Sequence, residues 1–119
     1  MSRFLTDLVL KDNGDGRTFT VVSALVYQSD ILRSALVVPA GTVTDLASIP
    51  LLPNHRTWSR AAVVHDWLYT VGQVPRLIAD DVLREAMIAL QVPAWRRGVV
   101  YLAVRVGGQA AWQAHRTVT

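Results

Sequence analysis

A run in the middle of the chain, Ala61–Tyr69, is almost entirely apolar, yet a histidine followed directly by an aspartate lies inside it. The run has the composition of a buried helix, and it contains His65 and Asp66. Burying a polar group without a partner costs about 2–7 kcal/mol. The chain must therefore either satisfy these two side chains with hydrogen bonds or use them in a functional site.

Two helices are predicted here, joined by a short link. The first contains the apolar run and ends at Gly72, and Thr57 or Ser59 is placed to cap its start. Pro75 suits the first turn of the second helix, at about 76–90. Because the link is short, we expect the two helices to run antiparallel as a hairpin.

A third helix is predicted at about 94–115, after Pro93. Gly107 and Gly108 are a weak point within it, because glycine costs about 1 kcal/mol in a helix interior.

The first half of the chain predicts β-strands. We expect strands over Phe4–Leu10, Thr18–Tyr27 and Ser34–Val38, which are rich in β-branched and aromatic residues. The turn Asp12–Gly16 contains Asn-Gly and Asp-Gly pairs, which adopt positive φ at little cost. The segment Thr42–Ile49 begins as a further strand.

A block of strands followed by a block of helices predicts an α+β fold. We expect a small N-terminal antiparallel sheet of three to four strands, over about residues 1–50, and a three-helix unit over about residues 57–116. A chain of 119 residues is long enough for one domain with its own core, and 1–119 is interpreted as a single domain.

Composition narrows the classes of function. Without cysteine the chain has no disulfide framework and no thiolate zinc site, which fits a reducing compartment. No apolar run reaches the roughly 18–20 residues that span a bilayer, and the first residues lack the features of a signal peptide. Net charge is only +3. The basic residues near the C-terminus are interpreted as a solvated helix face, which disfavours a nucleic-acid partner.

The helix hairpin places His65 within reach of Asp80. A carboxylate on one imidazole nitrogen fixes the tautomer and leaves the other nitrogen as a base near neutral pH. The same pair is also consistent with a structural contact, a charged hydrogen bond that ties the two helices together, and the physics alone slightly favours this interpretation. The sequence therefore leaves two roles open for His65 and Asp80, one catalytic and one structural.

Short polar residues precede the hairpin: Thr44, Asp45 and Ser48. Such residues cap helices or line sites. Oxygen ligands together with one imidazole suit calcium, magnesium or zinc, so a divalent metal is one hypothesis. The candidate ligands are Asp45 and Asp66, with His65 and Asp80 completing the group.

Two arginines flank Asp80 at four residues on either side, Arg76 and Arg84. They either form ion pairs on the helix or, in the case of Arg76, hold a phosphate or carboxylate of a ligand. Arg105 lies on the apolar side of the third helix, and we expect it to reach the same cluster.

Several motifs, in order and spacing, resemble a small family of unknown function that is encoded mainly by tailed bacteriophages and prophages. The resemblance covers about residues 34–108, and its motifs are these: VPAG at 38–41, TDLASIP at 44–50, AVVHDWLY at 62–69, Arg76 with Ala79-Asp80, and Tyr101 with Arg105. It implies a phage origin and a gene near the tail or lysis functions, and it supplies no activity. It also implies residence in the host cytoplasm or the virion.

A looser similarity is to the secreted phospholipase A2 helix, through His65, Asp66 and Tyr69 with Asp80 on the next helix. That resemblance implies that His65 activates water, Asp66 binds calcium, Asp80 orients the histidine and Tyr69 supports it. The glycine-rich calcium loop and the cysteines of that family are absent from this sequence.

Two functions follow. In the first, the chain carries a metal-dependent, hydrolase-like site, with His65 as general base, Asp80 as its orienting acid and Arg76 as an anion clamp. In the second, it is a non-catalytic virion, tail-assembly or host-interaction protein, whose cluster fixes the helices while Trp95 and Trp112 help form an interface. An open cleft at His65 would favour the first, and a sealed cluster with an exposed apolar patch, such as one over Trp112, would favour the second.

Overall fold

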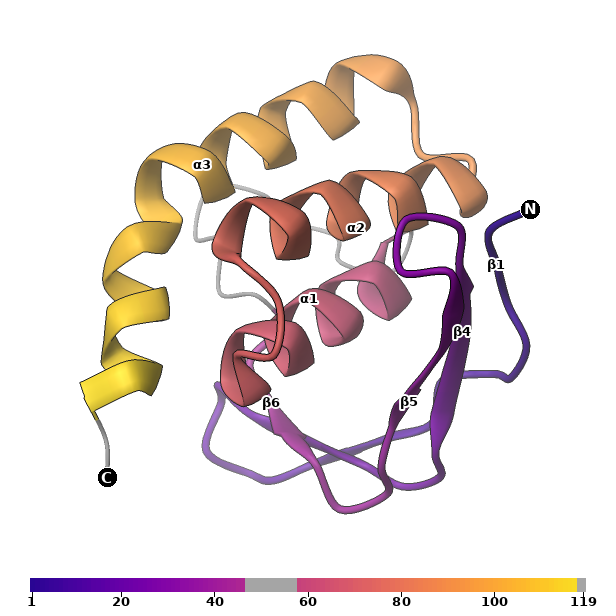
Figure 1. Ribbon diagram of the computed structural model, residues 1–119. Helices are drawn as coiled ribbons and strands as arrows, with labels where there is room; N and C mark the ends of the chain where they lie inside the picture. The colour runs from indigo at the N-terminus through magenta and orange to yellow at the C-terminus, as the bar shows by residue number, and fades with distance from the viewer. Residues whose placement is uncertain (47–57, 118–119) are drawn as a thin grey trace.

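The computed structural model describes residues 1–46 and 58–117. The described chain has six short strands followed by three helices (Figure 1). The α+β class predicted from the sequence is confirmed. In chain order the elements are β1 (Arg3–Phe4), β2 (Leu10–Asp12), β3 (Phe19–Val21), β4 (Leu25–Ser29), β5 (Ser34–Val38), β6 (Val43–Thr44), α1 (Ser59–Val71), α2 (Arg76–Ala89) and α3 (Ala94–Thr117).

The strands form two antiparallel sheets of three strands each, in the orders β1-β4-β5 and β2-β3-β6. A single sheet was expected, and the expected strands Phe4–Leu10 and Thr18–Tyr27 are each divided between the two sheets. The second division has a clear cause, because Val21 and Leu25 are buried while the three residues between them are exposed. There the chain leaves one sheet for the other, which a continuous run of strand-forming residues does not reveal.

The turn predicted at Asp12–Gly16 connects β2 to β3. Gly14 and Gly16 have φ of 78° and 71°, which is the conformation that only glycine adopts without strain. The Asp12 carboxylate accepts a hydrogen bond from the Gly14 amide at 2.8 Å. This segment is therefore a hairpin turn held by its own side chains.

The helices begin and end close to the predicted positions. Gly72 adopts the left-handed conformation with φ of 65° and donates its amide to the Leu68 carbonyl, which ends α1. Ser59 is the first residue of α1 rather than its cap, since Trp58 precedes the helix, and Thr57 lies outside the described residues. α3 continues through Gly107 and Gly108 as one helix, and it bends along its length (Figure 1).

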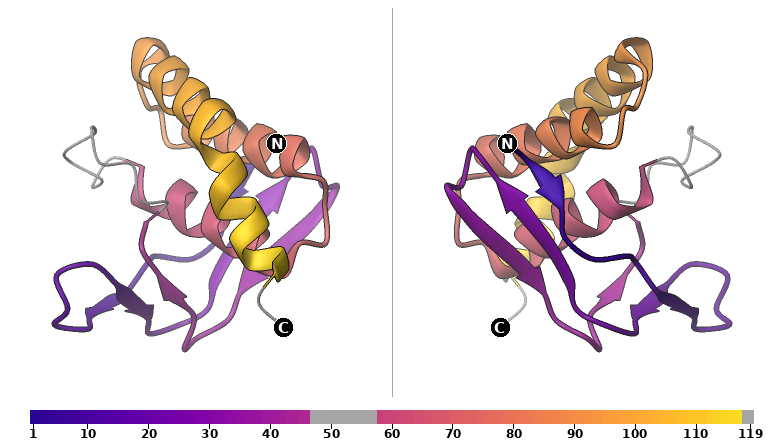
Figure 2. Two further views of the ribbon diagram at one scale, coloured as in Figure 1. Left: turned by 90° about the vertical axis from the view of Figure 1, so that its left-hand side faces the viewer. Right: turned by 90° about the vertical axis from the view of Figure 1, so that its right-hand side faces the viewer.

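The core lies between the strands and the α1–α2 pair, and α3 packs on that pair from the other side (Figure 2). Leu25 and Tyr27 of β4 are fully buried, as are Leu83 and Met87 of α2. Each such side chain contributes roughly 1.5–3 kcal/mol when buried. No helix in the described part of the chain has the length and apolar content needed to cross a membrane.

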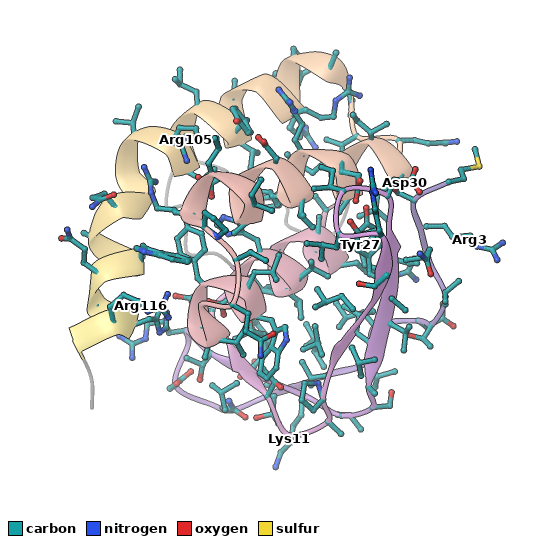
Figure 3. The ribbon with its side chains drawn as sticks, in the orientation of Figure 1. Arg3, Lys11, Tyr27, Asp30, Arg105 and Arg116 are labelled. Carbon is teal, nitrogen blue, oxygen red and sulfur yellow. The ribbon has the colours of Figure 1, made fainter. Side chains whose placement is uncertain are left out.

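A carboxylate on α2 joins this helix to the sheet β1-β4-β5 and to the turn that follows β4. The carboxylate of Glu85 accepts hydrogen bonds from the Tyr27 hydroxyl and the buried Ser29 hydroxyl, both at 2.7 Å, and from the Ile31 amide at 2.9 Å. Tyr27 lies on β4, beside the helices (Figure 3). Burial and the bond to Glu85 both raise the pKa of Tyr27. This contact fixes how α2 sits on the strands.

Candidate functional site

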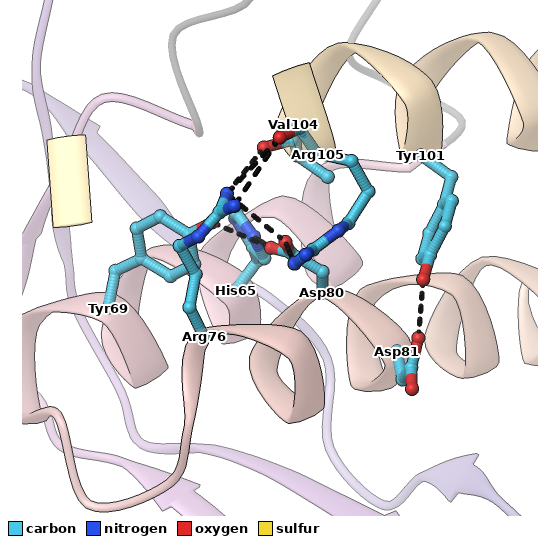
Figure 4. A network of polar contacts seen from close by, with 8 residues as sticks. All are labelled: His65, Tyr69, Arg76, Asp80, Asp81, Tyr101, Val104 and Arg105. Carbon is cyan, nitrogen blue, oxygen red and sulfur yellow. Dashed lines mark hydrogen bonds and ion pairs between the residues drawn. The ribbon is translucent and has the colours of Figure 1, made fainter. Parts of the chain in front are cut away.

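The α1–α2 hairpin brings one face of each helix together. His65 and Tyr69 lie one turn apart on α1, with ring centroids 4.3 Å from each other. Both side chains are directed at Asp80, in the second turn of α2 (Figure 4). The register predicted from the short link between the helices is confirmed.

Asp80 is the centre of the cluster. Its Oδ1 atom lies 2.7 Å from His65 Nε2 and accepts a hydrogen bond of 2.7 Å from the Tyr69 hydroxyl. Its Oδ2 atom accepts a hydrogen bond of 2.7 Å from the Arg105 guanidinium of α3. Asp80 is fully buried and His65 is 4 % exposed. One carboxylate therefore joins side chains from all three helices.

Arg76 lies beside this carboxylate but bonds mainly to α3. Its Nη1 atom is 3.7 Å from Asp80 Oδ2 and donates to the Val104 carbonyl at 3.1 Å. It also contacts the Arg105 carbonyl at 3.4 Å. Arg76 thus binds main-chain oxygens of α3 in the region where the helix contains its two glycines.

Gly108 allows this close approach. A Cβ atom at that position would lie 2.6 Å from the Tyr69 hydroxyl and 3.2 Å from Arg76 Nη1. The glycine pair that weakens the predicted helix therefore has a packing role in the cluster.

Hydrogen bonds and neighbouring charges determine which side chains of the cluster are ionised. Burial opposes ionisation of Asp80, but hydrogen bonds from His65, Tyr69 and Arg105 outweigh it, and the pKa of Asp80 is lowered. Burial and the bond to Asp80 raise the pKa of Tyr69, and the same carboxylate raises the pKa of Arg105. Asp80 is therefore ionised at neutral pH, with two arginines beside it.

The last turns of α3 hold Tyr69 from the other side. The Trp112 ring packs edge-on against Tyr69, with centroids 5.2 Å apart, and the Arg116 guanidinium lies 4.4 Å from the Trp112 centroid. Arg116, near the end of α3 (Figure 3), donates to the Tyr69 carbonyl at 2.7 Å and the Thr70 carbonyl at 3.1 Å. It satisfies carbonyls that α1 leaves open at its C-terminus. Trp112 is partly buried against the cluster, so the apolar patch that an assembly function would expose does not lie over this ring.

A neighbouring contact runs between α2 and α3. The Tyr101 hydroxyl donates to Asp81 at 2.7 Å, and the Arg84 guanidinium lies 4.7 Å from the Tyr101 ring centroid. Arg84 therefore contacts Tyr101, whereas the sequence suggested an ion pair with Asp80.

Thr44, Asp45 and Asp66 form a second group on another side of α1. Asp66 Oδ2 accepts a hydrogen bond of 3.3 Å from the Asp45 amide, and Thr44 also bonds to the Asp66 side chain. Burial, chiefly, raises the pKa of Asp66. Asp66 and His65 thus have different partners, as their adjacent positions on a helix predict. Ser48 lies outside the described residues.

Within residues 1–46 and 58–117, no group of three or more His, Cys, Asp or Glu side chains is arranged to hold a metal ion. The proposed ligands Asp45 and Asp66 lie together, while His65 and Asp80 are bonded to each other. The metal hypothesis therefore stays a prediction, based on two carboxyl groups and not on four ligands.

Sequence reasoning brought together His65, Tyr69, Arg76, Asp80 and Arg105, and it missed two parts of the cluster. These are the Trp112–Arg116 pair and the carbonyl oxygens that Arg76 binds. Gly107-Gly108 was the available signal, because a glycine inside a helix often marks a close approach of other atoms.

Neither the curated proteins nor the solved structures contain a match to this chain. The model of one protein family, described as a protein of unknown function (DUF1353), matches residues 19–104, which is well over half of the chain. The matched segment includes His65, Tyr69 and Asp80 and ends one residue before Arg105. The expected family of unknown function is confirmed to that extent: the chain belongs to the DUF1353 family.

Proposed function

We propose that this protein is a non-catalytic binding protein of a phage particle, and that the Asp80 cluster holds its three helices in one register. The partner is another virion protein or a host protein. The observation that carries the proposal is the state of Asp80: it is fully buried, and its two oxygens accept three hydrogen bonds, from two side chains of α1 and one of α3. Such a carboxylate is well placed to orient helices.

The position of His65 supports the same conclusion. A general base must come within hydrogen-bond reach of the proton that it removes from a substrate or water. His65 is 4 % exposed, with one ring nitrogen on Asp80 and its ring against Tyr69. A structural role needs only this packing, whereas catalysis needs a further opening of the site.

The phage setting rests on the motif resemblance. The segments 38–41, 44–50 and 62–69, with the arginines and aspartate of the later helices, resemble proteins encoded mainly by tailed phages and prophages. Small phage proteins with a rigid helical face suit assembly or host contact, which is the second of the two functions considered above.

Thermal unfolding of His65→Ala, with and without calcium, magnesium or zinc, tests the proposal. If the cluster is structural, the variant loses about 3–5 kcal/mol of stability, as breaking a buried charged pair does, and no metal changes the result. The matched control is His115→Ala, an exposed histidine on α3, which should melt like the parent protein. A small loss in His65→Ala, or a metal-dependent shift in the parent protein, would overturn the proposal.

A metal-dependent hydrolase is the second candidate. One observation favours it: Asp66, which follows His65, accepts a hydrogen bond from the Asp45 amide, and the Asp45 carboxyl is near enough to contribute to the raised pKa of Asp66. Carboxylate oxygens suit calcium and magnesium. Calorimetric titration with each metal tests this candidate, and Asp66→Asn should abolish any binding that depends on the pair.

A further inference from the structure

The outer face of α3 carries a line of exposed apolar side chains, which we call the α3 stripe: Trp95, Val99, Leu102 and Val106. Their exposed fractions are 66 %, 46 %, 64 % and 76 %. Single exposed apolar residues are ordinary on a protein surface, whereas a continuous line of them marks an interaction site.

The spacing of the stripe indicates what shape fits it. Successive members are four, three and four residues apart, so they share one narrow face of the helix. The opposite face, which includes Val100, Val104 and Gly108, is buried against α1 and α2. A narrow line with alternating three- and four-residue steps is the seam of a coiled coil, and a bilayer surface favours a wider apolar face.

The charged residues beside the α3 stripe indicate which charge a partner surface should carry. α3 contains no aspartate or glutamate. Arg96 and Arg105 lie on the two flanks of the stripe, and the Arg96 guanidinium lies 5.2 Å from the Trp95 ring centroid. The Arg105 side chain is 30 % exposed while it donates to Asp80, and Arg76 lies beside the same carboxylate, so the two arginines leave a net positive charge there. A second α3 packed on this seam would place cation against cation, which disfavours a dimer of this chain through the stripe.

We propose that the α3 stripe binds an acidic amphipathic helix of another protein. The partner helix carries leucine, valine or isoleucine at three- and four-residue steps and glutamate or aspartate beside them, facing Arg96 and Arg105. Gly98 lies next to the seam, and a Cβ atom there would have open space around it, so a helix can approach closely. This proposal rests on the binding function proposed above and names the partner's chemistry.

A designed helical peptide of about four heptads, with leucine at the seam positions and glutamate at the flanking positions, is the probe. Its labelled form is titrated with the protein, and fluorescence anisotropy gives the Kd. A second peptide has lysine in place of every glutamate. We expect the acidic peptide to bind at least about tenfold more tightly than the basic one, with an affinity that falls as salt rises.

Two variants locate the binding. Leu102→Glu places a charge in the stripe, and Leu77→Glu makes the same change at an exposed leucine on α2. Leu102→Glu should raise the Kd at least about tenfold, while Leu77→Glu should leave it within about twofold. Both positions are exposed, so both variants should melt within a few degrees of the parent protein, and circular dichroism checks this.

Three results would overturn the proposal: equal binding of both peptides, equal effects of the two variants, or absence of binding to the acidic peptide. Sedimentation and vesicles of phosphatidylcholine with phosphatidylserine test the other occupants. A dimer, or vesicle binding, that Leu102→Glu removes would also overturn it. None of these results depends on the His65→Ala melts, so failure of the stripe proposal is distinguishable from failure of the structural role of the cluster.

Discussion

The imidazole of His65 and the carboxylate of Asp80 lie 2.7 Å apart across the contact between α1 and α2. The two residues are 15 positions apart in the sequence, and the pair is buried. Tyr69 and Arg105 bond to the same carboxylate, so the contact is part of a network that spans three helices. The contribution of this network to the free energy of unfolding can therefore be measured with single substitutions.

Asp80→Asn should destabilise the protein by about 3–5 kcal/mol in urea unfolding, because it leaves the Arg105 guanidinium beside a neutral group in a partly buried place. Asp81→Asn is the matched control. Asp81 accepts a hydrogen bond from the Tyr101 hydroxyl, and the weaker acceptor in this variant should cost about 1 kcal/mol. Equal losses in the two variants would contradict the central role of Asp80.

Much of this cluster is predictable from the sequence. A histidine in an apolar run, a short link and an acid in the second turn of the next helix are enough to pair His65 with Asp80. The carbonyls that Arg76 binds are not predictable in this way, because every residue has a carbonyl and no sequence pattern marks those two. The packing of Trp112 on Tyr69 depends on how α3 bends, which is a property of the folded helix.

The helices are more predictable than the strands for a physical reason. Gly72 and Pro75 change the backbone locally and mark where helices stop and start. The change of sheet between β3 and β4 has no such mark, because Val21 and Leu25 both suit a strand and only their partners differ. Sheet membership is decided by contacts with residues far along the chain, such as Val38, which pairs with Leu25.

Acid should destabilise the protein through Asp80. Its pKa is lowered in the folded state, so its contribution to stability is complete above its ordinary value of about 3.9 and is lost as pH falls through the folded pKa. Melting temperatures between about pH 7 and pH 3 should therefore fall less steeply in Asp80→Asn than in the parent protein. Asp15, whose hydrogen bonds from Thr18 and Arg17 lower its pKa to about 2, titrates in both proteins and does not affect the comparison. Identical slopes would contradict the prediction.

Asp66→Asn should have the opposite effect from Asp80→Asn. Burial raises the pKa of Asp66, so the folded state loses stability as pH rises and this group becomes charged. Asparagine removes that cost and keeps an oxygen that accepts the hydrogen bond from the Asp45 amide. The variant should melt at a higher temperature than the parent protein near pH 7, and at a similar temperature below about pH 4, where the carboxyl is protonated. A lower melting temperature near pH 7 would show that the ionised carboxylate of Asp66 is needed.

Alanine at the two adjacent glycines of α3 should change stability in opposite directions. A Cβ atom at position 107 has nothing within 4 Å, so Gly107→Ala should stabilise the protein by about 0.5–1 kcal/mol through helix propensity alone. At position 108 the same atom would lie 2.6 Å from the Tyr69 hydroxyl, which is held on Asp80 by a 2.7 Å hydrogen bond. Gly108→Ala must therefore displace Tyr69, and we expect a net loss of about 1–3 kcal/mol, the usual cost of overpacking. Urea unfolding of both variants measures the difference, and a gain in stability at both positions would mean that Tyr69 can move without loss and that its bond to Asp80 contributes little.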